Sequence, residues 1–456
     1  MVSIEGMIAM ARMIQRGLVL TGVAIMLAAL LLAGNADAQK NSVKQGDPDV
    51  SQQLLYSRLV SVPPQFVGSY QGPYSFNLPA GFTTPAVFAS GLSSPRMIAV
   101  GACGDLYAGS SGGTVYRLPD RNHDGVADGV YTLTTGLPNP AHSVEYWNGR
   151  YYVGAGDGVY RFDQANCDVA GSNQTKIVDL PRDLPSGGGH VTRTVVHGLD
   201  GKLYVSVGSS CNVCVEVDSR RAAILRFAAD GPSSSQEIFS SGMRNDVGLA
   251  FRPGTNDLWT TENGRDYLGN GEGPEAFNYY PPEEVNFAQA GRYYGWPYCF
   301  ADGKEDRSAN GTNSVAPPAY NGNGKSLAQY CAASSKPIAQ MQAHSAPMAI
   351  LFSKDSSLGF PASWKKGIFV AQHGSWNRSN NGSYPPVGYK IVYIPAFAGH
   401  TGNNWNPPSL DFLTSNPQQA VRPVGLLIGT DNALYFSADN SGTIYRIAYS
   451  GLSDGQ

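Results

Sequence analysis

A short pattern recurs six times along the chain and constrains the fold more than any other feature. It consists of a turn with Gly, Asp or Asn, a strand ending in an aromatic and small residues, and a second turn leading to a strand like Val-Tyr-Arg. Alternation of apolar and polar residues predicts strands with one buried face. The copies cover residues 102–118, 147–162, 199–210 with 223–227, 254–264, 365–376 with 389–395, and 430–447.

Six such units favour a closed ring of sheets. Repeats of a few strands around an axis are typical of a β-propeller, so six copies predict an all-β, six-bladed β-propeller. Radial closure also avoids long exposed sheet edges. The composition agrees, because 54 Gly and 30 Pro favour turns and 42% hydrophobic residues can form a large core. A stack of β-sandwiches is the alternative that the repeat leaves open.

The N-terminal segment predicts export. Residues 18–33 carry no charge, Arg12 and Arg16 precede them, and Ala36-Asp37-Ala38 offers a small-x-small cleavage site. This arrangement predicts a signal peptide over residues 1–38 and a periplasmic or secreted protein. An uncleaved anchor is the alternative. No later segment is apolar enough to cross a bilayer, so we expect no stable membrane span after cleavage.

The remaining chain divides around the predicted propeller. Residues 39–80 are rich in Gln, Ser and Pro and are expected to wrap or tether as an N-terminal extension. Residues 81–449 hold the six units, and the long stretch 265–345 is expected to cap one mouth of the propeller as an insertion. Residues 450–456 form a short tail.

Charge and cysteine content exclude several classes of protein. The formal charge is −3 and no basic block exists, so nucleic-acid binding is not expected. Six cysteines fit an exported, disulfide-bonded chain. Cys211 and Cys214 favour a local disulfide, since a zinc ribbon needs a second such pair and haem attachment needs a His where Val215 stands; a redox-active pair is the alternative. Further plausible bridges are Cys103 with Cys167 and Cys299 with Cys331, but sequence leaves the connectivity open.

Loops just before several repeat cores carry cationic side chains. Propellers bind ligands at the mouth of the central channel, and the planar fork of arginine matches carboxylates. The sequence therefore predicts an anionic ligand there, whereas separate pairing of each arginine with a carboxylate of a blade is the alternative. His190 follows three glycines and is a candidate general base. The side chains in question are Arg96, His190, Arg193, Arg244, Asn245, His373, Arg378 and Arg422.

These loops carry a resemblance to a known family. Taken together they resemble the sorbosone and glucose dehydrogenases, which are soluble six-bladed propellers that use pyrroloquinoline quinone (PQQ) and calcium. The resemblance extends over roughly residues 80 to 449. The motifs are Gly-His-Val-Thr-Arg at 189–193, Ser-Gly-Met-Arg-Asn-Asp-Val-Gly-Leu-Ala-Phe at 241–251, Thr-Glu-Asn-Gly-Arg-Asp-Tyr-Leu-Gly-Asn at 261–270, Pro-Pro-Glu-Glu-Val-Asn at 281–286, His-Gly-Ser-Trp-Asn-Arg at 373–378 and Arg-Pro-Val-Gly-Leu at 422–426.

The resemblance implies an oxidoreductase that oxidises a sugar or sugar aldehyde. His190 would take the proton of the substrate hydroxyl while hydride moves to the quinone, and Arg244 would stabilise the developing oxyanion. Electrons would pass to an external acceptor, a cytochrome or a quinone. Arg422 stands alone where the glucose-oxidising branch has two arginines, so the chain looks closer to sorbosone-type or broader pyranose-type members.

The resemblance also implies a set of binding residues. The carbonyl groups of Gly264 and Arg265 match those that bind the catalytic calcium, and Arg422 matches a residue that anchors a cofactor carboxylate. The further cofactor contacts that it implies are Arg244, Asn245, Asn263, Trp376, Asn377, Arg378 and Lys390.

A second calcium motif can be read without any family. The stretch Asp-Arg-Asn-His-Asp-Gly-Val-Ala-Asp at 120–128 resembles the first part of an EF-hand loop, with Asp120, Asn122, Asp124 and Asp128 as oxygen ligands. Tyr131 replaces the bidentate Glu at position 12. We expect a structural calcium there, and a plain hairpin turn is the alternative.

Two other functions remain open at this point. A calcium-dependent propeller lactonase would need carboxylate and Asn ligands converging on a metal in the channel, whereas this mouth is rich in arginine. A non-catalytic binding propeller would not need the base His190 together with Arg244 and Asn263.

Overall fold

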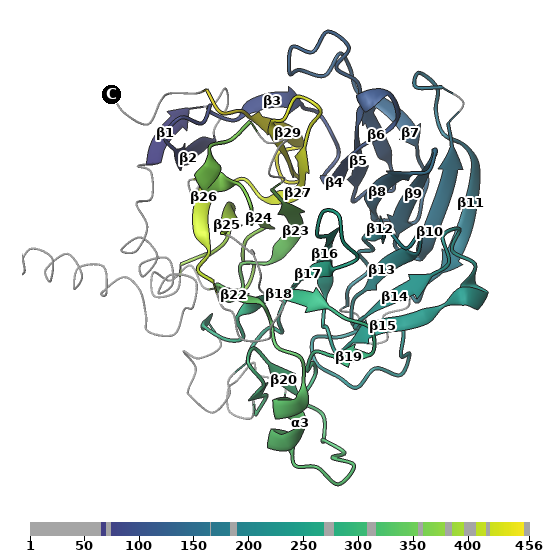
Figure 1. Ribbon diagram of the computed structural model, residues 1–456, viewed down its shortest axis with the longest axis vertical. Helices are drawn as coiled ribbons and strands as arrows, with labels where there is room; N and C mark the ends of the chain where they lie inside the picture. Colours follow the sequence, from purple (N-terminus) through teal and green to yellow (C-terminus); the bar gives the residue numbers. More distant parts are fainter. Residues whose placement is uncertain are drawn as a thin grey trace, which may run out of the picture.

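The protein is built almost entirely of strands arranged around one axis (Figure 1). The computed structural model describes residues 65–69, 74–164, 166–182, 189–268, 278–307, 316–353, 359–378, 385–395, 407–415 and 420–450. The predicted signal peptide at 1–38 and the tail residues 451–456 lie outside the described residues. No helix in the described ranges is long and apolar enough to cross a membrane.

Six antiparallel four-stranded blades make up the described propeller, and the first five run in chain order from the axis outward. Blade 1 contains β4 (Pro95–Val100), β5 (Leu106–Ser110), β6 (Val115–Leu118) and β7 (Tyr131–Thr134). Blade 2 contains β8 (Ala141–Trp147), β9 (Arg150–Ala155), β10 (Gly158–Asp163) and β11 (Ser172–Asp179). Blade 3 contains β12 (Val195–His197), β13 (Leu203–Val207), β14 (Ala223–Phe227) and β15 (Glu237–Ser241).

The second half of the ring repeats this plan and closes it. Blade 4 contains β16 (Asp246–Phe251), β17 (Leu258–Glu262), β18 (Glu283–Ala288) and β22 (Ala339–Met341). Blade 5 contains β23 (Pro347–Phe352), β24 (Ile368–Gln372), β25 (Lys390–Ile394) and β26 (Leu410–Ser415). Blade 6 contains β27 (Pro423–Ile428), β28 (Leu434–Ala438), β29 (Thr443–Ile447) and, from the other end of the chain, β3 (Ala86–Ala89). Because β3 pairs with β29, hydrogen bonds between the two ends of the propeller sequence close the ring.

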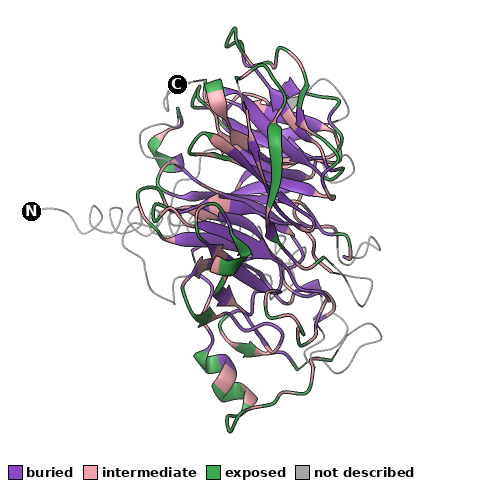
Figure 2. Ribbon diagram, turned by 90° about the vertical axis from the view of Figure 1, so that its right-hand side faces the viewer, coloured by how far each residue is buried: buried purple, intermediate pink, exposed green. Residues whose placement is uncertain are grey.

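The predicted fold class is confirmed, and the repeat cores correspond to the middle strands of the blades. The core at 102–118 contains β5 and β6, and the core at 430–447 contains β28 and β29. Phe436 stacks on Tyr445 within blade 6, and both lie in a core cluster with Phe369 and Phe412 of blade 5. Buried strands fill the interior, whereas exposed residues gather in loops and near the outer helix (Figure 2).

The predicted N-terminal extension contributes strands to the sheet system. Within 39–80, the described residues form β1 (Gln65–Ser69) and β2 (Ser75–Pro79), a hairpin that pairs with β26 at the outer edge of blade 5. This pairing covers an edge that would otherwise be open.

The stretch 265–345 was expected to be a capping insertion, but it also supplies the two outer strands of blade 4. Its strand β18 begins with two glutamates and β22 has three residues, so neither shows the expected alternating pattern. Between them β19 (Arg292–Tyr293) pairs in parallel with β15 and extends the sheet of blade 3. The hairpin of β20 (Cys299–Phe300) and β21 (Lys304–Glu305) follows, and then α3 (Leu327–Ala333), which Ser326 caps. The remaining short helical turns are η1 (Ala102–Gly104), η2 (Ser233–Ser235) and η4 (Ala362–Trp364).

Three disulfides pair all six cysteines. Cys103 bonds Cys167, Cys211 bonds Cys214, and Cys299 bonds Cys331, so the three predicted pairs are confirmed.

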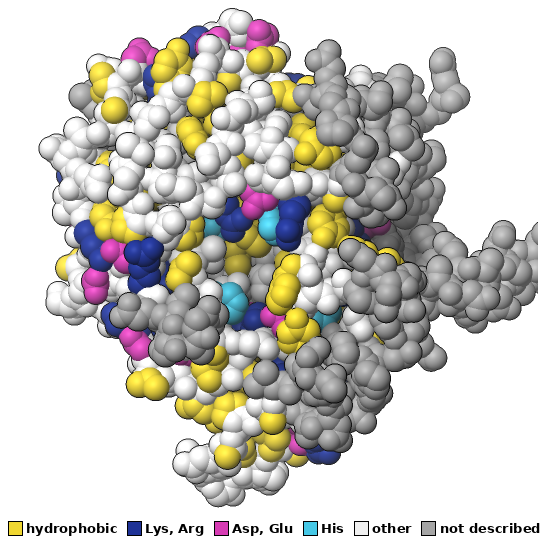
Figure 3. Space-filling model, turned by 180° about the vertical axis from the view of Figure 1, so that it is seen from behind, with side chains coloured by type: hydrophobic (Ala, Val, Ile, Leu, Met, Phe, Trp, Pro, Cys, Tyr) yellow, Lys and Arg dark blue, Asp and Glu magenta, His cyan; other side chains and the backbone are white. Residues whose placement is uncertain are grey.

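A channel runs along the propeller axis. Side chains from all six innermost strands or the residues beside them line a cavity of about 190 Å³, among them Ile98, Val144, Val195, Leu249 and Ile350. Because every blade begins with its innermost strand, the loops before those strands and after the second strands gather at one mouth. Figure 3 shows a face on which basic and His side chains gather around a hollow near the middle.

Candidate functional site

The predicted residues around His190 come together on the blade 3 and blade 4 side of the mouth. His190 precedes β12, and its Nδ1 lies 3.0 Å from Ser209 Oγ and 3.3 Å from the Ser209 carbonyl oxygen, just after β13. Gly208 is required there, because a Cβ would lie 2.4 Å from His190 Cβ and 2.6 Å from Asn245 Oδ1. His190 and Asn245 are therefore packed against the same bare stretch of backbone.

The His190 ring is neutral at physiological pH. Burial lowers its pKa well below the ordinary value, and the positive charges of Arg244, Arg193 and Arg221 lower it further, although a hydrogen bond with Ser209 acts in the opposite direction. A neutral imidazole has a lone pair with which to accept a proton, as a general base must.

Arg244 sits beside His190 with only 5% of its surface exposed. One terminal nitrogen donates to the carbonyl oxygens of Gly264, at 2.7 Å, and Asn263, at 3.2 Å. The other contacts a carboxylate oxygen of Asp266 at 3.2 Å. Burial lowers the pKa of Arg244, and the charges of Asp266, Glu283 and Glu262 act in the opposite direction, so the guanidinium keeps its charge at neutral pH. The Gly264 carbonyl predicted to bind calcium thus faces a fixed cation here.

A second polar cluster lies on the blade 5, 6 and 1 side of the mouth. Asp439 follows β28 and accepts hydrogen bonds from Arg96 at 2.8 Å and from His373 at 2.9 Å. Burial alone would raise the pKa of Asp439, but the hydrogen bond from His373 and the charges of His373, Arg96 and Arg422 hold it below its ordinary value. Arg422 donates to the carbonyl oxygens of His373 and Gly374. Three cationic or protonatable groups thus face one carboxylate.

The two clusters are connected across the mouth. Asn377, in the loop after β24, donates to Asp266 at 2.7 Å, and Asp266 pairs with Arg244. On the other side, Arg96 donates to His142 Nδ1 at 3.2 Å, and the charge of Arg193 reaches His142 as well. Side chains from all six blades therefore share this mouth, and the blade 2 member is His142, which the five predicted loops did not include.

The structure gives several other predicted contacts partners of their own. Lys390 pairs with Asp411 at 2.9 Å, and the side chain of Asn263 donates to the Pro347 carbonyl at 2.7 Å. The Arg265 guanidinium forms a buried pair with Asp306 at 2.6 Å, so only its main chain is left to serve a metal. The two remaining residues each contact an aromatic ring: Trp376 is 68% exposed beside Tyr267, and the Arg378 guanidinium lies over the ring of Tyr279.

The predicted calcium loop at 120–128 lies at the other end of the strands, between β6 and β7. Its carboxylates accept hydrogen bonds from its own backbone: Asp120 from Gly125, Asp124 from Val126, and Asp128 from Arg121. The Asn122 side chain contacts Asp124 at 2.9 Å. In the described part of the chain, the sole group of three potential metal-ligating residues drawn together is Cys211, Cys214 and Glu216, where the sulfurs form a disulfide. Calcium binding by this loop stays a prediction.

Sequence reasoning missed several residues of the mouth. His142 starts β8 and is fully buried, and burial together with the charges of Arg96 and Arg193 lowers its pKa well below the ordinary value. Asp439 occupies the position after a second strand that Asn263 and His373 hold in other blades. Comparison of the repeats position by position, rather than a search for arginines, would have found it. Ser209, Asn212 and Asp266 were missed because their roles are contacts to other side chains.

The residues of the mouth fit an acidic, polar ligand and an oxygen-seeking cation. Among the described residues, His142 Nε2 and Asn245 Oδ1 are buried polar atoms near the mouth that have no hydrogen-bond partner. Arg96, Arg244 and Arg422 supply positive charge for carboxylates. The Gly264 carbonyl and the Asp266 carboxylate are oxygen donors of the kind that calcium takes.

The fold and the mouth together define a six-bladed β-propeller with a neutral histidine among arginines at its channel. The model of the TrAA12-like family matches residues 76–450, so the chain belongs to the TrAA12-like family. The predicted kinship with quinone-dependent sugar dehydrogenases is thereby confirmed.

Named relatives agree with this assignment. The chain is 26% identical over 437 residues to a pyrroloquinoline quinone-dependent pyranose dehydrogenase of Coprinopsis cinerea, with 86% of this chain and 56% of that protein covered. The chain thus spans little more than half the length of that relative.

Solved structures show the same fold. The holo form of the pyranose dehydrogenase PQQ domain from Coprinopsis cinerea matches with a TM-score of 0.66 at 24% identity, covering 84% of this chain and 98% of that domain. The calcium structure of a Trichoderma reesei enzyme of carbohydrate-active family AA12 matches with a TM-score of 0.66 at 23% identity, covering 86% and 98%.

Proposed function

We propose that the protein is a PQQ- and calcium-dependent dehydrogenase that oxidises a sugar or sugar aldehyde. The observation that carries the proposal is the neutral His190 held beside the charged Arg244 at a mouth shared by all six blades. Membership of the TrAA12-like family supports it, as do relatives described as PQQ-dependent pyranose and sugar dehydrogenases.

The cofactor would be held by the cations of the mouth. Arg244, Asn245 and Arg422 are the principal contacts we propose, with Asn263, Trp376, Arg378 and Lys390 at the periphery. When bound, the quinone supplies a hydride acceptor and calcium supplies Lewis acidity. The carbonyl oxygens of Gly264 and Arg265 would hold the metal. The Gly264 oxygen has two lone pairs, so it can keep its contact with Arg244 while it binds a cation.

His190 would perform the proton chemistry. Its neutral ring accepts the proton of the substrate hydroxyl, and the charge of Arg244 close by keeps the ring from being protonated by solvent before the substrate arrives. The same guanidinium stabilises negative charge that develops on an oxygen near it, in a buried place where such an interaction is strong.

The cellular setting we propose follows from the N-terminal segment. A cleaved signal peptide would place the protein in the periplasm or outside the cell, where an external acceptor, a cytochrome or a quinone, would collect the electrons. The disulfides at three separate places in the chain agree with an oxidising compartment.

The test is reconstitution of the purified protein. We would add PQQ, calcium and a dye acceptor and then a panel of aldoses, ketoaldoses and lactones. Calcium-dependent dye reduction by a sugar or sugar aldehyde is the expected result. Hydrolysis of a lactone without the quinone, or no reaction with any sugar, would overturn the proposal.

A further inference from the structure

We propose that the loop of residues 209–214, closed by the Cys211–Cys214 disulfide, positions the two central groups of the mouth. Ser209 would fix which nitrogen of His190 carries the proton, and Asn212 would fix the plane of the Arg244 guanidinium. The inference rests on the proposed function, because it assigns supporting residues to the same base and the same cation.

Ser209 determines the tautomer through a chain of two hydrogen bonds. Its hydroxyl donates to the Cys211 carbonyl at 2.6 Å, so it has no second hydrogen to donate to His190. Its Oγ can therefore only accept from His190 Nδ1, 3.0 Å away, and the Ser209 carbonyl oxygen, 3.3 Å from the same nitrogen, is also an acceptor. Nδ1 must then carry the hydrogen, which leaves the lone pair on Nε2 to accept a proton from substrate.

The main chain holds the same pair in register. The His190 N–H donates to the Ser209 carbonyl at 2.9 Å, and the Ser209 N–H donates to the Arg244 carbonyl at 2.8 Å. One residue thus connects the base on the β12 side with the cation on the β16 side. A shift of Ser209 would move both groups relative to each other.

Asn212 holds one edge of the Arg244 guanidinium at two points. Arg244 Nε donates to the Asn212 carbonyl at 3.0 Å, and a terminal nitrogen donates to Asn212 Oδ1 at 2.9 Å. The opposite edge faces the carbonyl groups of Asn263 and Gly264. A planar group held along two edges cannot rotate, so its charge stays directed to one place.

Asn212 is itself fixed by neighbours. Its amide exchanges two hydrogen bonds with the main chain of Asp266, at 3.0 and 2.9 Å, and its carbonyl accepts from Trp296 Nε1 at 3.2 Å. Since the Asp266 carboxylate also pairs with Arg244, the three residues form a closed set of contacts.

The disulfide closes the segment that contains the partners of Ser209 and of Arg244. The Cys211 carbonyl accepts the hydroxyl proton of Ser209, and Asn212 lies between the two bonded cysteines. A ring of four residues leaves the backbone at 211 and 212 few alternative conformations. Glu216 holds Ser210 in place within this loop, because its two carboxylate oxygens accept hydrogen bonds from the Ser210 N–H and hydroxyl, each at 2.7 Å.

The first experiment observes the His190 ring in the protein without cofactor. Long-range proton–nitrogen NMR of ¹⁵N-histidine-labelled protein, with His190→Gln for assignment, distinguishes the two neutral tautomers. We expect the Nδ1–H form in the wild type and a mixture in Ser209→Ala, with the single form restored in Ser209→Thr. The Nε2–H form in the wild type, or an unchanged tautomer in Ser209→Ala, would overturn the proposal.

The second experiment measures the pH profile of turnover. Charges facing His190 come from Arg244, Arg193 and Arg221. Ser209→Ala keeps the Ser209 carbonyl, whose hydrogen bond raises the pKa of His190. It removes the hydroxyl acceptor of Nδ1, which carries a hydrogen in the protonated ring too, so Ser209→Ala should move the acidic limb of kcat/KM to lower pH. It should also lower kcat about tenfold at unchanged KM, because only part of the rings present the lone pair. Ser353→Ala, which removes a buried hydroxyl bonded to Gly367, is the matched control and should change neither.

The third experiment tests the disulfide and Asn212. Cys211→Ser with Cys214→Ser should lower kcat about tenfold through loss of positioning, whereas Cys103→Ser with Cys167→Ser should keep kcat at a temperature where it is folded. Asn212→Ala should behave like the first pair, and Asn212→Asp, which keeps an acceptor for Arg244, should recover part of the loss. Equal kcat in all these variants would contradict the proposal.

These outcomes separate the two claims. If the wild type reduces no dye with any sugar but shows the Nδ1–H ring that Ser209→Ala loses, the proposed function fails and the positioning role of Ser209 stands. If the wild type is active and its variants keep both tautomer and pH profile, the positioning role fails and the function stands.

Discussion

Cys103–Cys167 and Cys211–Cys214 are both disulfides next to charged groups, yet they do different things in this fold. The first joins residues 64 apart in sequence, from η1 of blade 1 to the connection after β10 of blade 2. The second joins residues three apart, in the loop that contacts His190 and Arg244. One bond ties two blades together, and the other shapes a short loop of the mouth.

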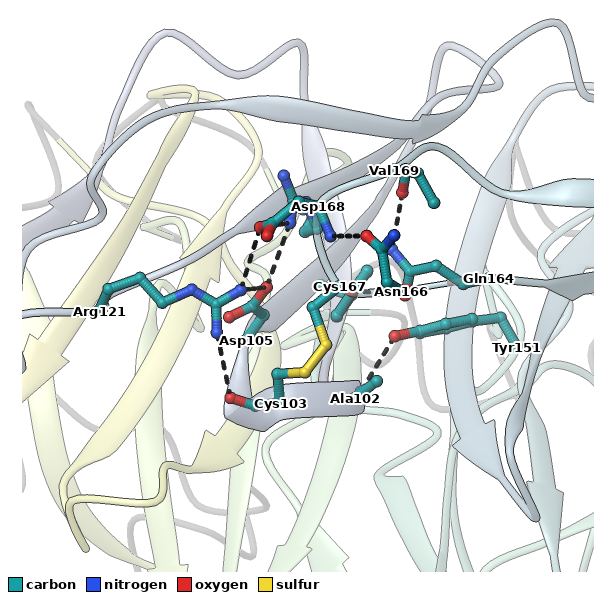
Figure 4. Close-up of a disulfide and its surroundings, with 12 residues drawn as sticks. Ala102, Cys103, Asp105, Arg121, Tyr151, Gln164, Asn166, Cys167, Asp168 and Val169 are labelled. Carbon is teal, nitrogen blue, oxygen red and sulfur yellow. Dashed lines mark hydrogen bonds and ion pairs between the residues drawn. A yellow bond between two sulfur atoms is a disulfide. The ribbon is translucent and has the colours of Figure 1, made fainter.

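The Cys103–Cys167 disulfide lies among ion pairs and hydrogen bonds that stabilise the fold (Figure 4). Arg121 reaches Asp105 at 3.0 Å and Asp168 at 3.5 Å, and Tyr151 accepts from the Ala102 N–H at 3.0 Å. The contacts of Asp168 and Tyr151 connect the same two blades as the disulfide does, whereas the Arg121–Asp105 pair lies within blade 1. None of them leads to the mouth, because they lie where the innermost strands end rather than where they begin.

The comparison indicates that the sequence separation of two cysteines predicts whether their disulfide contributes mainly stability or mainly local geometry. In the chain-entropy view, closing about 65 residues restricts the unfolded chain far more than closing four. The long bond should therefore contribute mainly stability. The short bond restricts the unfolded chain only a little, so we expect its main contribution to be the geometry of Ser209, Cys211 and Asn212.

The largest expected effect concerns His190, the group that the short loop serves. His190→Ala should lower kcat roughly a thousandfold and leave PQQ binding largely intact, because the base is lost but the cations remain. His123→Ala, on the exposed 120–128 loop, is the control and should keep kcat. Steady-state dye reduction and a quinone titration measure the two quantities. Unchanged turnover would show that His190 is not the general base, and the positioning role proposed for the loop of residues 209–214 would then fail as well.

The next effect concerns Arg244, the other group that the loop holds. Arg244→Gln should lower kcat/KM about a hundredfold through loss of oxyanion stabilisation. Since the charge of Arg244 lowers the pKa of His190, its removal should raise that pKa and move the acidic limb of kcat/KM to higher pH. This shift is opposite in sign to that expected for Ser209→Ala. Arg226→Gln is the control, because Arg226 pairs with Glu237 on blade 3 away from the mouth, and its loss should leave the profile unchanged.

The disulfides themselves sharpen the comparison through stability. Removal of Cys103–Cys167 should lower the free energy of unfolding by about 4 kcal/mol, and removal of Cys211–Cys214 by about 2 kcal/mol. Denaturant unfolding of the two double Ser variants measures both. Together with kcat, the two variants should show opposite rankings for stability and for activity. The same ranking in both measurements would break the distinction.

The smallest effect tests the other side of the mouth. His142 is buried and neutral, and its folded pKa lies well below the unfolded value near 6.5. Below pH about 6.5 the unfolded state binds more protons than the native state, so this residue makes stability fall as pH falls, by at most about 1.4 kcal/mol per pH unit. His142→Gln should flatten that fall. Unfolding of both proteins at several pH values checks it, and parallel curves would contradict it.

Much of the fold could be predicted because the propeller repeats itself. Strands such as Val115–Leu118 and Thr443–Ile447 alternate in sequence, and six copies leave few arrangements. The expectation of one buried face was wrong, because packing between blades buries both faces and leaves only Tyr116 and Arg446 half-buried. Blade 4 was harder, because Glu283 and Glu284 are buried by bonds to backbone N–H groups and an amide, which no alternation reveals. Polar burial of this kind depends on partners far away in sequence.

The site could be predicted in part for a related reason. Arginines before innermost strands indicate the mouth, because position in the repeat decides the end of the channel at which a residue lies. Sequence could not show that Asp439 offsets Arg96, that His142 lies beneath them, or that Asn212 holds Arg244. Each of those contacts joins different loops or blades.

Calorimetric titration of the unliganded protein with PQQ, with and without calcium, decides whether the mouth is a quinone site. We expect one quinone per chain, tighter binding with calcium, and weaker binding in Arg244→Ala and Arg422→Ala. No binding, or binding that neither calcium nor these two arginines affects, would contradict it.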